Sequence, residues 1–325
     1  MTTTPPSFDP ELGAVFAAVL APTGQTSVAT GITPEMLGAA REALDEITPS
    51  LEELAADERF ELERLGVPGP AGEVGLLILR PKGLDGPRPV VYYVHGGGLM
   101  LGTNRYGLGP TLDLAHRLRL VVVSVEYRLA PEHPFPAGLD DAYAGLAWVA
   151  EHAGRVSGDP GRIILAGASA GGTLAAALAL LARDRGRIAV LAQLLMYPML
   201  DDRNDTVSAR QMRGLGVWDD ISNETGWAAW LGDAAGSDEP SPYAVPGRAP
   251  DLAGLPPALL DVGSAETFRD EVAAFAGRIW AAGGDAELHV WPGAFHGADT
   301  LAPHAAIVQH MQAARLNWLL RQLGE

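Results

Sequence analysis

Cysteine is absent from this chain of 325 residues, and lysine occurs once, at Lys82. The absence of cysteine excludes disulfide frameworks, thiolate zinc sites, iron–sulfur clusters and a cysteine nucleophile. Lys82 lies in the turn-like stretch Arg80-Pro81-Lys82-Gly83, so the chain has no P-loop, whose lysine follows a glycine-rich turn. A single lysine in such a turn also leaves little room for a Schiff base or a Ser-x-x-Lys acyltransferase site.

Long apolar runs and a positive charge balance are lacking as well. No apolar stretch reaches about 18 residues, the length that a membrane-spanning helix needs. The apolar run 14–21 does not read as a signal peptide, which has positive charge before its apolar part. Here Asp9 and Glu11 precede the run, and the first basic residue is Arg41. Forty acidic against 23 basic side chains give a net charge of −17, which repels nucleic acids and anionic lipids. We therefore expect a cytoplasmic protein with no membrane span and no nucleic-acid partner.

The apolar residues indicate an N-terminal helical segment, residues 1–55, followed by a larger unit, residues 56–325. Helical spacing occurs in Leu12-Val15-Phe16-Val19 and in Met36-Leu37-Ala40-Leu44. From about residue 58, short apolar runs alternate with segments of helical period. The strand-like runs are Leu76–Leu79, Val90–Val94, Val121–Val125, Ile163–Ala166, Leu191–Met196, Ala258–Val262 and Leu288–Val290.

Several of these runs are apolar on successive residues, which is typical of strands that helices cover on both faces. The segments of helical period are 136–150, 173–185, 268–282 and 303–323. Strands and helices that alternate in this way predict a mostly parallel, doubly wound α/β sheet. Residues 201–247 break the alternation, because they are rich in Asp, Ser, Gly and Pro and have no strand-like run. We interpret this region as an insertion.

The segment Gly167-Ala168-Ser169-Ala170-Gly171 directly follows the predicted strand Ile163–Ala166 and precedes a predicted helix. A G-x-S-x-G turn between a strand and a helix strains the backbone at the serine, and its glycines let the two elements approach closely. Such a turn exposes the serine at the carboxyl edge of the sheet. Ser169 is therefore the predicted nucleophile; the alternative is a tight turn with a capping serine.

A second glycine-rich segment, His95-Gly96-Gly97-Gly98, follows another predicted strand. A serine that attacks a carbonyl creates an oxyanion, which needs fixed hydrogen-bond donors, and consecutive glycines leave backbone N–H groups accessible. We expect the N–H groups of Gly97, Gly98 and Ala170 to form an oxyanion hole. His95 is interpreted as a residue that shapes the loop, not as a base. An ordinary glycine-rich turn is the alternative.

The serine needs a base, and in this fold class the chain order is serine, acid, histidine. His296 lies in the loop after the last predicted strand and is the predicted base. Its competitors are a histidine within that strand, His289, and two on the following helix, His304 and His310. All three fit packing or surface roles better.

The acid that orients the base is expected in the turn after the strand Ala258–Val262. Glu266 lies in this turn and is the predicted acid, whereas Asp270, about one helical turn further, is an alternative. An acidic start of an ordinary helix remains open, because the helix dipole favours carboxylates there. Asp261 lies within the strand and needs a partner of its own if it is buried.

These residues resemble the hormone-sensitive-lipase-like branch of the α/β-hydrolases, the bacterial family IV carboxylesterases with an HGGG motif. Four segments carry the resemblance, which covers most of residues 60–325: His95–Gly98, Tyr127–Ala137, Gly167–Gly172 and Arg269–Glu271. It implies an α/β-hydrolase fold with a mostly parallel eight-stranded sheet and a helical cap formed by residues 1–55 and about 201–247. It also implies short-chain ester hydrolysis, no metal or organic cofactor, and a homodimer through the sheet edge.

The chain departs from the family pattern at two positions. The family usually has Asp before the nucleophile, where this chain has Ala168, and Asp as the acid, where this chain has Glu266. The first change makes the site less acidic. The second adds one methylene, and the longer side chain still reaches an imidazole. Neither change removes a reacting atom.

We therefore expect a serine carboxylesterase that hydrolyses short-chain, uncharged esters through an acyl-enzyme. One alternative is a ligand-binding protein on the same scaffold, as in the plant gibberellin receptors, which resemble this family but lack the catalytic histidine that His296 supplies here. Another is an amidase or thioesterase with the same residues. Candidate apolar walls of the substrate pocket, for which core packing is an equal alternative, are Leu99, Met100, Tyr197 and Trp218.

Overall fold

Within residues 4–21 and 31–324, which the computed structural model describes, eight strands form one sheet in the order β1-β2-β4-β3-β5-β6-β7-β8. β1 and β2 are antiparallel, β2 is antiparallel to β4, and the pairs from β4 to β8 are parallel. The predicted eight-stranded, mostly parallel sheet is confirmed. Its strands are β1 (Phe60–Gly69), β2 (Gly72–Pro81), β3 (Arg88–Val94), β4 (Val121–Glu126), β5 (Gly158–Ala168), β6 (Val190–Met196), β7 (Ala258–Gly263) and β8 (Ala286–Trp291).

Seven of these strands contain the apolar runs identified in the sequence, and β1 is the one that those runs missed. β1 is an edge strand, and its first residues alternate between apolar Phe60 and Leu62 and acidic Glu61 and Glu63. This alternation is the pattern of a half-exposed strand. It is short and stops at Arg64, which is why a search for continuous apolar runs passes over it.

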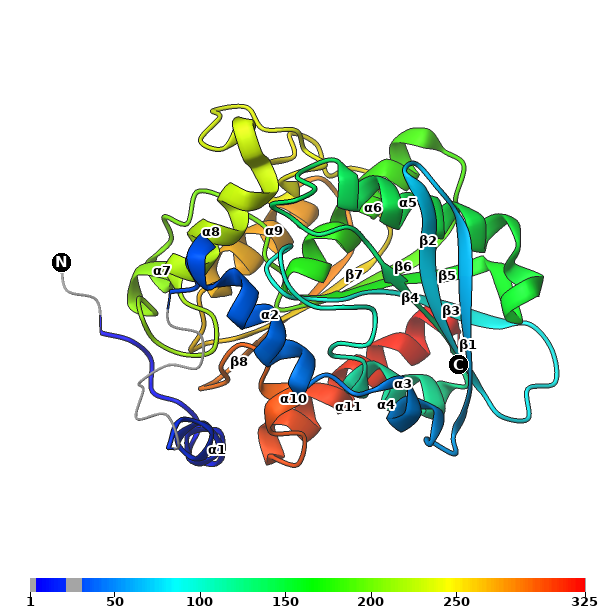
Figure 1. Cartoon of the computed structure of the whole chain (residues 1–325), viewed down its shortest axis with the longest axis horizontal. Helices are drawn as coiled ribbons and strands as arrows, with labels where there is room; N and C mark the ends of the chain where they lie inside the picture. The colour runs from blue at the N-terminus through cyan, green and yellow to red at the C-terminus, as the bar shows by residue number, and fades with distance from the viewer. Residues whose placement is uncertain (1–3, 22–30, 325) are drawn as a thin grey trace.

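Helices cover both faces of the sheet, which explains the unbroken apolar runs of its central strands (Figure 1). α4 (Gly109–Leu118) and α11 (Ala306–Leu323) contact each other on one face, below the sheet in Figure 1. On the other face lie α5 (Ala137–Glu151), α6 (Ala170–Arg185) and α9 (Arg269–Ala281). Residues 90–94 of β3 are consequently all buried. The four predicted helices are confirmed, with ends that shift by at most three residues.

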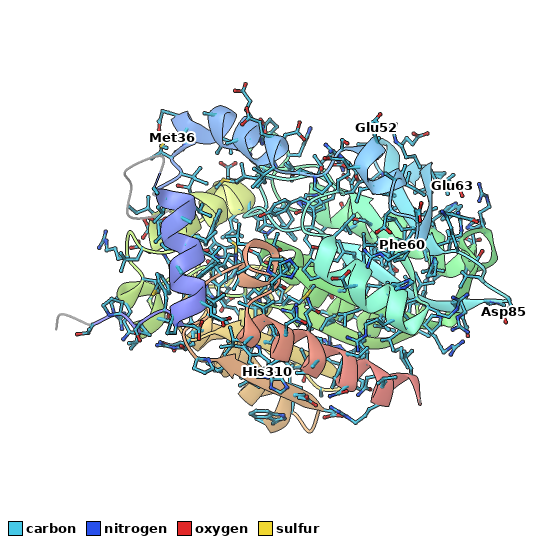
Figure 2. All side chains as sticks on the ribbon, turned by 90° about the horizontal axis from the view of Figure 1, so that it is seen from below. Met36, Glu52, Phe60, Glu63, Asp85 and His310 are labelled. Atoms are coloured by element: carbon cyan, nitrogen blue, oxygen red, sulfur yellow. The ribbon has the colours of Figure 1, made fainter. Side chains whose placement is uncertain are left out.

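The N-terminal segment and the region 201–247 both contain short helices and contact each other. The N–H of Ile32 donates to Ser222 Oγ at 3.0 Å, and the N–H of Gly31 donates to Asp219 Oδ2 at 3.1 Å. Figure 2 shows Met36, the last residue of the short helix η1 (Pro34–Met36), at the outer edge of the molecule. The helices of this part are α1 (Pro10–Leu20), η1 (Pro34–Met36), α2 (Leu37–Glu46), α3 (Leu51–Ala55), α7 (Val207–Gln211), α8 (Asp220–Leu231), η3 (Gly232–Ala234) and η4 (Pro246–Arg248).

The predicted N-terminal unit, residues 1–55, includes positions 1–3 and 22–30, which lie outside the described residues. The predicted larger unit, residues 56–325, includes position 325, which also lies outside them. The division into these two units stays a prediction. Two short helices complete the fold, η2 (Ala153–Val156) and α10 (Ala298–Leu301). In the part of the chain that the structure describes, no helix combines the length and the apolar character needed to cross a membrane.

Candidate active site

Ser169 stands at the sharp turn between β5 and α6. Its φ of +57° and ψ of −124° are strained for a residue with a side chain. Its N–H donates to the carbonyl oxygen of Met196 at 2.9 Å, which ties the turn to β6. A Cβ on Gly167 would lie 2.1 Å from the carbonyl oxygen of Gly171, so strand and helix approach as closely as the G-x-S-x-G pattern predicts.

His296 lies beside this serine, on the loop between β8 and α10. Its Nε2 is 2.9 Å from Ser169 Oγ, although the two residues are 127 positions apart in the chain. Two aromatic rings pack against its ring in T-shaped geometry, Tyr197 at 4.9 Å and Phe268 at 5.2 Å between centroids. These contacts fix the plane of the imidazole and leave Nε2 directed at the hydroxyl.

The other candidate histidines lie elsewhere. His289 Nε2 is 2.8 Å from Glu287 Oε1, and its ring stacks on Trp291. His304 is exposed in the turn before α11, not on the helix as expected, and His310 is exposed on α11, as Figure 2 shows. The surface and packing roles predicted for these three histidines agree with their surroundings.

Glu266 is the carboxylate that faces the far side of the imidazole. Its Oε2 lies 3.6 Å from His296 Nδ1, beyond hydrogen-bond length, and the N–H of Ala265 donates to the carbonyl oxygen of Ala294, which joins the two turns. Burial raises the pKa of the Glu266 carboxyl above its usual value, and the facing imidazole opposes that shift.

Asp270, the alternative acid, has other partners. Its carboxylate accepts from the N–H of Ser208 at 2.8 Å and from Arg269 Nε at 2.7 Å. These bonds lower the pKa of Asp270 against the opposing effect of its partial burial. The carboxylate thus links α9 to α7, whereas Glu266 is the acid beside the imidazole.

The glycine-rich loop after β3 passes close to the serine. A Cβ on Gly96 would lie 3.3 Å from Ser169 Cβ. Among the described residues, no backbone or side-chain acceptor is bonded to the N–H groups of Gly97, Gly98 or Ala170. The three donors predicted for the oxyanion hole are therefore free to bind another oxygen.

His95 is fully buried at the start of this loop. Its Nδ1 is 2.8 Å from the carbonyl oxygen of Gly96, and its ring stacks on Tyr127 with 4.2 Å between centroids. Burial lowers the pKa of His95 to about 4, so the ring is neutral at pH 7. These contacts agree with the predicted loop-shaping role.

The candidate pocket residues divide into two pairs. Tyr197 borders His296, and Trp218 packs on the loop so closely that a Cβ on Gly98 would lie 2.2 Å from its ring. Leu99 and Met100 are completely buried and offer no exposed surface. The assignment of these four residues to the substrate pocket stays a prediction, and for Leu99 and Met100 the structure favours the alternative of core packing.

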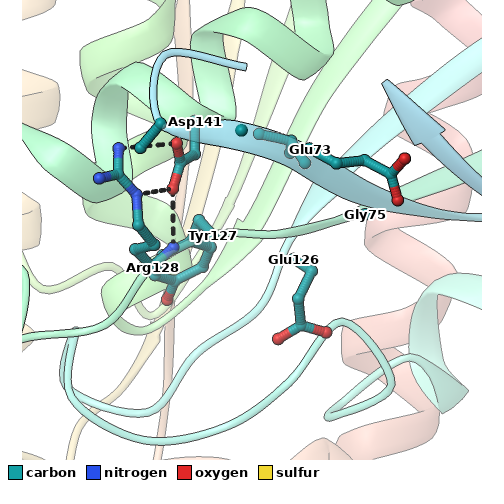
Figure 3. A pocket seen from close by; sticks show the side chains of 9 residues that line it. Glu73, Gly75, Glu126, Tyr127, Arg128 and Asp141 are labelled. Atoms are coloured by element: carbon teal, nitrogen blue, oxygen red, sulfur yellow. Dashed lines mark hydrogen bonds and ion pairs between the residues drawn. The ribbon is translucent and has the colours of Figure 1, made fainter. Parts of the chain in front are cut away.

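The site is covered, since Ser169 is only 6% and His296 only 8% exposed. An open cleft lies elsewhere, where β2 begins and β4 ends (Figure 3). Its volume is about 300 Å³, and the ion pair of Arg128 Nε with Asp141 Oδ2, at 2.7 Å, forms one wall. None of the predicted catalytic residues lines this cleft.

A fully buried ion-pair network behind the histidine loop was not identified from the sequence. Arg315 of α11 donates to Asp261 through Nε at 2.7 Å and to Asp299 through Nη1 at 2.6 Å. Tyr197 Oη donates to the second oxygen of Asp299 at 2.8 Å. Only the need of Asp261 for a partner was visible in the sequence, because a strand residue does not show which distant cation will meet it.

Sequence and structure comparisons relate this chain to known proteins. A sequence model of the family described as alpha/beta hydrolase fold matches residues 91–300. The carboxylesterase NlhH of Mycobacterium tuberculosis is 38% identical over 268 residues, 75% of this chain and 77% of the relative. A solved bacterial heroin esterase has a TM-score of 0.87 and 36% identity, with 98% of each chain covered. Esterase LipW from Mycobacterium marinum has a TM-score of 0.85 and 38% identity, with 99% of each chain covered.

Proposed function

Because this chain belongs to the α/β-hydrolase family, in its hormone-sensitive-lipase-like branch, we propose that it is a serine carboxylesterase that hydrolyses short-chain, uncharged esters. The observation that carries this proposal is the 2.9 Å contact between His296 Nε2 and Ser169 Oγ, at the turn where the family has its nucleophile. The carboxylesterase and esterase names of similar proteins support the same reaction class.

The reaction begins with proton transfer from the Ser169 hydroxyl to His296 Nε2. As that proton leaves, Oγ forms a bond to the ester carbonyl carbon, and the carbonyl π electrons move onto oxygen. The resulting oxyanion accepts hydrogen bonds from the N–H groups of Gly97, Gly98 and Ala170. The imidazolium then gives its proton to the leaving alcohol, the C–O bond breaks and an acyl-enzyme remains.

Deacylation repeats these steps with water. His296 takes a proton from the water, the hydroxide adds to the acyl carbon, and Ser169 leaves as its oxygen regains the proton. Since Nε2 acts as the acceptor, the ring proton of the neutral histidine must be on Nδ1, which faces Glu266. Glu266 thereby selects this tautomer and stabilises the imidazolium.

The preference for small, uncharged substrates is inferred from the surroundings of the serine. Tyr197 and Trp218 place aromatic rings beside His296 and Gly98, and little of Ser169 is exposed. The net charge of −17 disfavours anionic esters. An apolar, covered site favours an acyl group of few carbons over a long chain that has to extend outward.

The proposal is tested with p-nitrophenyl esters from acetate to palmitate. The wild-type enzyme should hydrolyse acetate and butyrate fastest, and Ser169→Ala should lose the burst of p-nitrophenol while keeping its circular dichroism spectrum. Equal turnover by Ser169→Ala would contradict the nucleophile assignment. Faster hydrolysis of palmitate at an interface would indicate a lipase.

Two other functions use the same residues differently. Comparing an ester with its matched amide and thioester separates the proposed esterase from an amidase or thioesterase. The alternative of a ligand-binding protein predicts no covalent chemistry, yet the base it would lack, His296, is in contact with the serine. The ester burst experiment therefore also decides this alternative.

The remaining expectations concern assembly and location. A homodimer through the sheet edge is proposed, and the exposed side chains of Val290 on the edge strand β8 and of Trp280 on the neighbouring α9 support β8 as that edge. Sedimentation of Val290→Lys against wild type tests it. A cytoplasmic location and catalysis without a cofactor are likewise proposed, from the composition and the site chemistry.

A further inference from the structure

Arg41 reaches from α2 of the N-terminal segment to the loop that carries Gly97 and Gly98. Its Nε donates to the carbonyl oxygen of Met100 at 2.9 Å, and its Nη2 donates to the carbonyl oxygen of Ala130 at 3.0 Å. Its two terminal nitrogens also bind the Glu132 carboxylate, at 2.7 and 2.8 Å. One guanidinium therefore joins α2, the glycine loop and the segment after β4.

The glycine loop has a backbone conformation that needs external support. φ is +119° at Gly97, +60° at Gly98 and +65° at Leu99. Leu99 has a side chain that disfavours this left-handed conformation, and such strain persists only where surrounding contacts fix the backbone. Bonds from outside the loop therefore influence the direction of its N–H groups.

The segment after β4 supplies two of these bonds. Tyr127 Oη donates to the carbonyl oxygen of His95 at 3.0 Å, and the N–H of Ala130 donates to the carbonyl oxygen of Leu99 at 3.0 Å. Arg41 links the two segments further, because its guanidinium donates hydrogen bonds to the carbonyl oxygens of both Ala130 and Met100. A charged donor makes shorter and stronger hydrogen bonds than a neutral one. The Met100 carbonyl is thus held by the stronger type of donor.

We propose that Arg41 is a positioning residue for the oxyanion hole, through which the N-terminal segment helps to hold Gly97 and Gly98 in their catalytic orientation. The inference rests on the proposed esterase function and assigns part of it to a residue outside the catalytic motifs. An oxyanion exists only after Ser169 has attacked, so a displaced donor weakens the transition state more than the bound substrate. Loss of Arg41 should lower kcat and leave KM nearly unchanged.

Arg105 provides a matched control on the same part of the fold. Its Nη2 donates to Asp45 at 2.8 Å and its Nη1 donates to the carbonyl oxygen of Pro49 at 2.6 Å, so it also attaches the α2–α3 region to the catalytic unit. Among the described residues, none of its bonds reaches residues 96–101. Arg105→Ala therefore removes a similar attachment without touching the glycine loop.

The experiment compares wild type, Arg41→Ala, Arg41→Lys and Arg105→Ala with p-nitrophenyl acetate and with a trifluoromethyl ketone, whose adduct on Ser169 carries an oxyanion. We expect Arg41→Ala to lower kcat by about tenfold, less than loss of an oxyanion donor itself, with KM within about twofold. Inhibitor affinity should fall by a similar factor. Arg41→Lys should recover part of the lost kcat and part of the lost inhibitor affinity. Arg105→Ala should retain wild-type kinetics.

Two outcomes would overturn the inference: equal kinetics for the two alanine variants, or a loss in Arg41→Ala confined to KM. If Arg41→Ala fails to fold, as judged by circular dichroism, Arg41→Gln carries the same test, since its side chain is too short to hold the same carbonyl groups and carboxylate together. An inactive wild-type enzyme would reject the proposed esterase function instead, and the two failures are thereby distinguished.

Discussion

Glu266 faces His296 with its Oε2 3.6 Å from Nδ1, while both of its carboxylate oxygens are buried without a hydrogen-bond partner among the described residues. An ionised carboxylate in such surroundings destabilises the fold, because it has lost water and gained no hydrogen bond. The positive charge that forms on the imidazole during acyl transfer offsets this cost. Stability and catalysis therefore make opposite demands on Glu266.

Glu266→Gln should accordingly raise stability at pH 7 while lowering kcat by roughly 10²- to 10⁴-fold. Burial raises the pKa of Glu266 in the folded protein above its value in the unfolded chain. The protonated carboxyl therefore favours the folded state at acid pH, and this contribution to the free energy of unfolding is lost as pH rises through the folded-state pKa. The stability gain of the variant should then grow between acid and neutral pH. Thermal unfolding at pH 4 to 8 measures it, and a gain that is greatest in acid would contradict the sign.

Gly98→Ala should lower kcat by about 10²-fold, because the added Cβ would lie 2.2 Å from the Trp218 ring and at a φ of +60°. The loop or the Trp218 side chain must move, which displaces an oxyanion donor. Gly277→Ala in α9 is the control, since nothing lies within 4 Å of its added Cβ, and it should stabilise the helix by about 0.5–1 kcal/mol. Steady-state kinetics with p-nitrophenyl acetate measure both, and unchanged kcat in Gly98→Ala would argue against this loop as the oxyanion hole.

His95 should remain neutral until the pH approaches 4, because burial lowers its pKa to about 4. The unfolded chain binds a proton at His95 near pH 6.5, so folding stability should fall from there down to about pH 4, by on the order of 3 kcal/mol. Nitrogen-15 NMR of labelled histidines follows the ring directly. A His95 signal that titrates near pH 6.5 in the folded protein would contradict the prediction.

Arg315→Met should destabilise the protein by about 3–5 kcal/mol, because it leaves the buried carboxylates of Asp261 and Asp299 without their cation. Arg321→Met, on the same helix, removes an exposed pair with Glu287 and should cost less than about 1 kcal/mol. Urea unfolding compares the two variants. Equal losses would mean that the buried network contributes no more than a surface pair.

Most of the sheet was accessible to sequence analysis because β2 to β7 contain buried, largely apolar runs, whereas the half-buried edge strand β8 was found from Leu288 and Val290. β1 escaped it because an edge strand exposes one face, and its alternation lasts only from Phe60 to Glu63. Helix ends shifted because apolar periodicity does not mark the first turn of a helix. α6 starts at Ala170, directly after the strained Ser169, whereas apolar periodicity is visible only from Thr173.

The proposed catalytic residues were accessible to sequence analysis because each lies in a short motif at the carboxyl end of a strand. Arg41 and Arg315 were not, since their roles depend on partners far along the chain, such as Met100 for Arg41 and Asp261 for Arg315. An arginine on a helix carries no local mark of the carbonyl or carboxylate that it will meet. Such contacts become visible only once the fold brings the elements together.

The most direct test of the proposed mechanism is covalent labelling with a p-nitrophenyl phosphonate, followed by mass spectrometry of the intact protein and its peptides. One phosphonyl group should appear on Ser169 in the wild type, at a much lower rate in His296→Ala, and at no position in Ser169→Ala. A label on another residue, or an unlabelled wild-type protein, would contradict the assignment of Ser169 as the nucleophile.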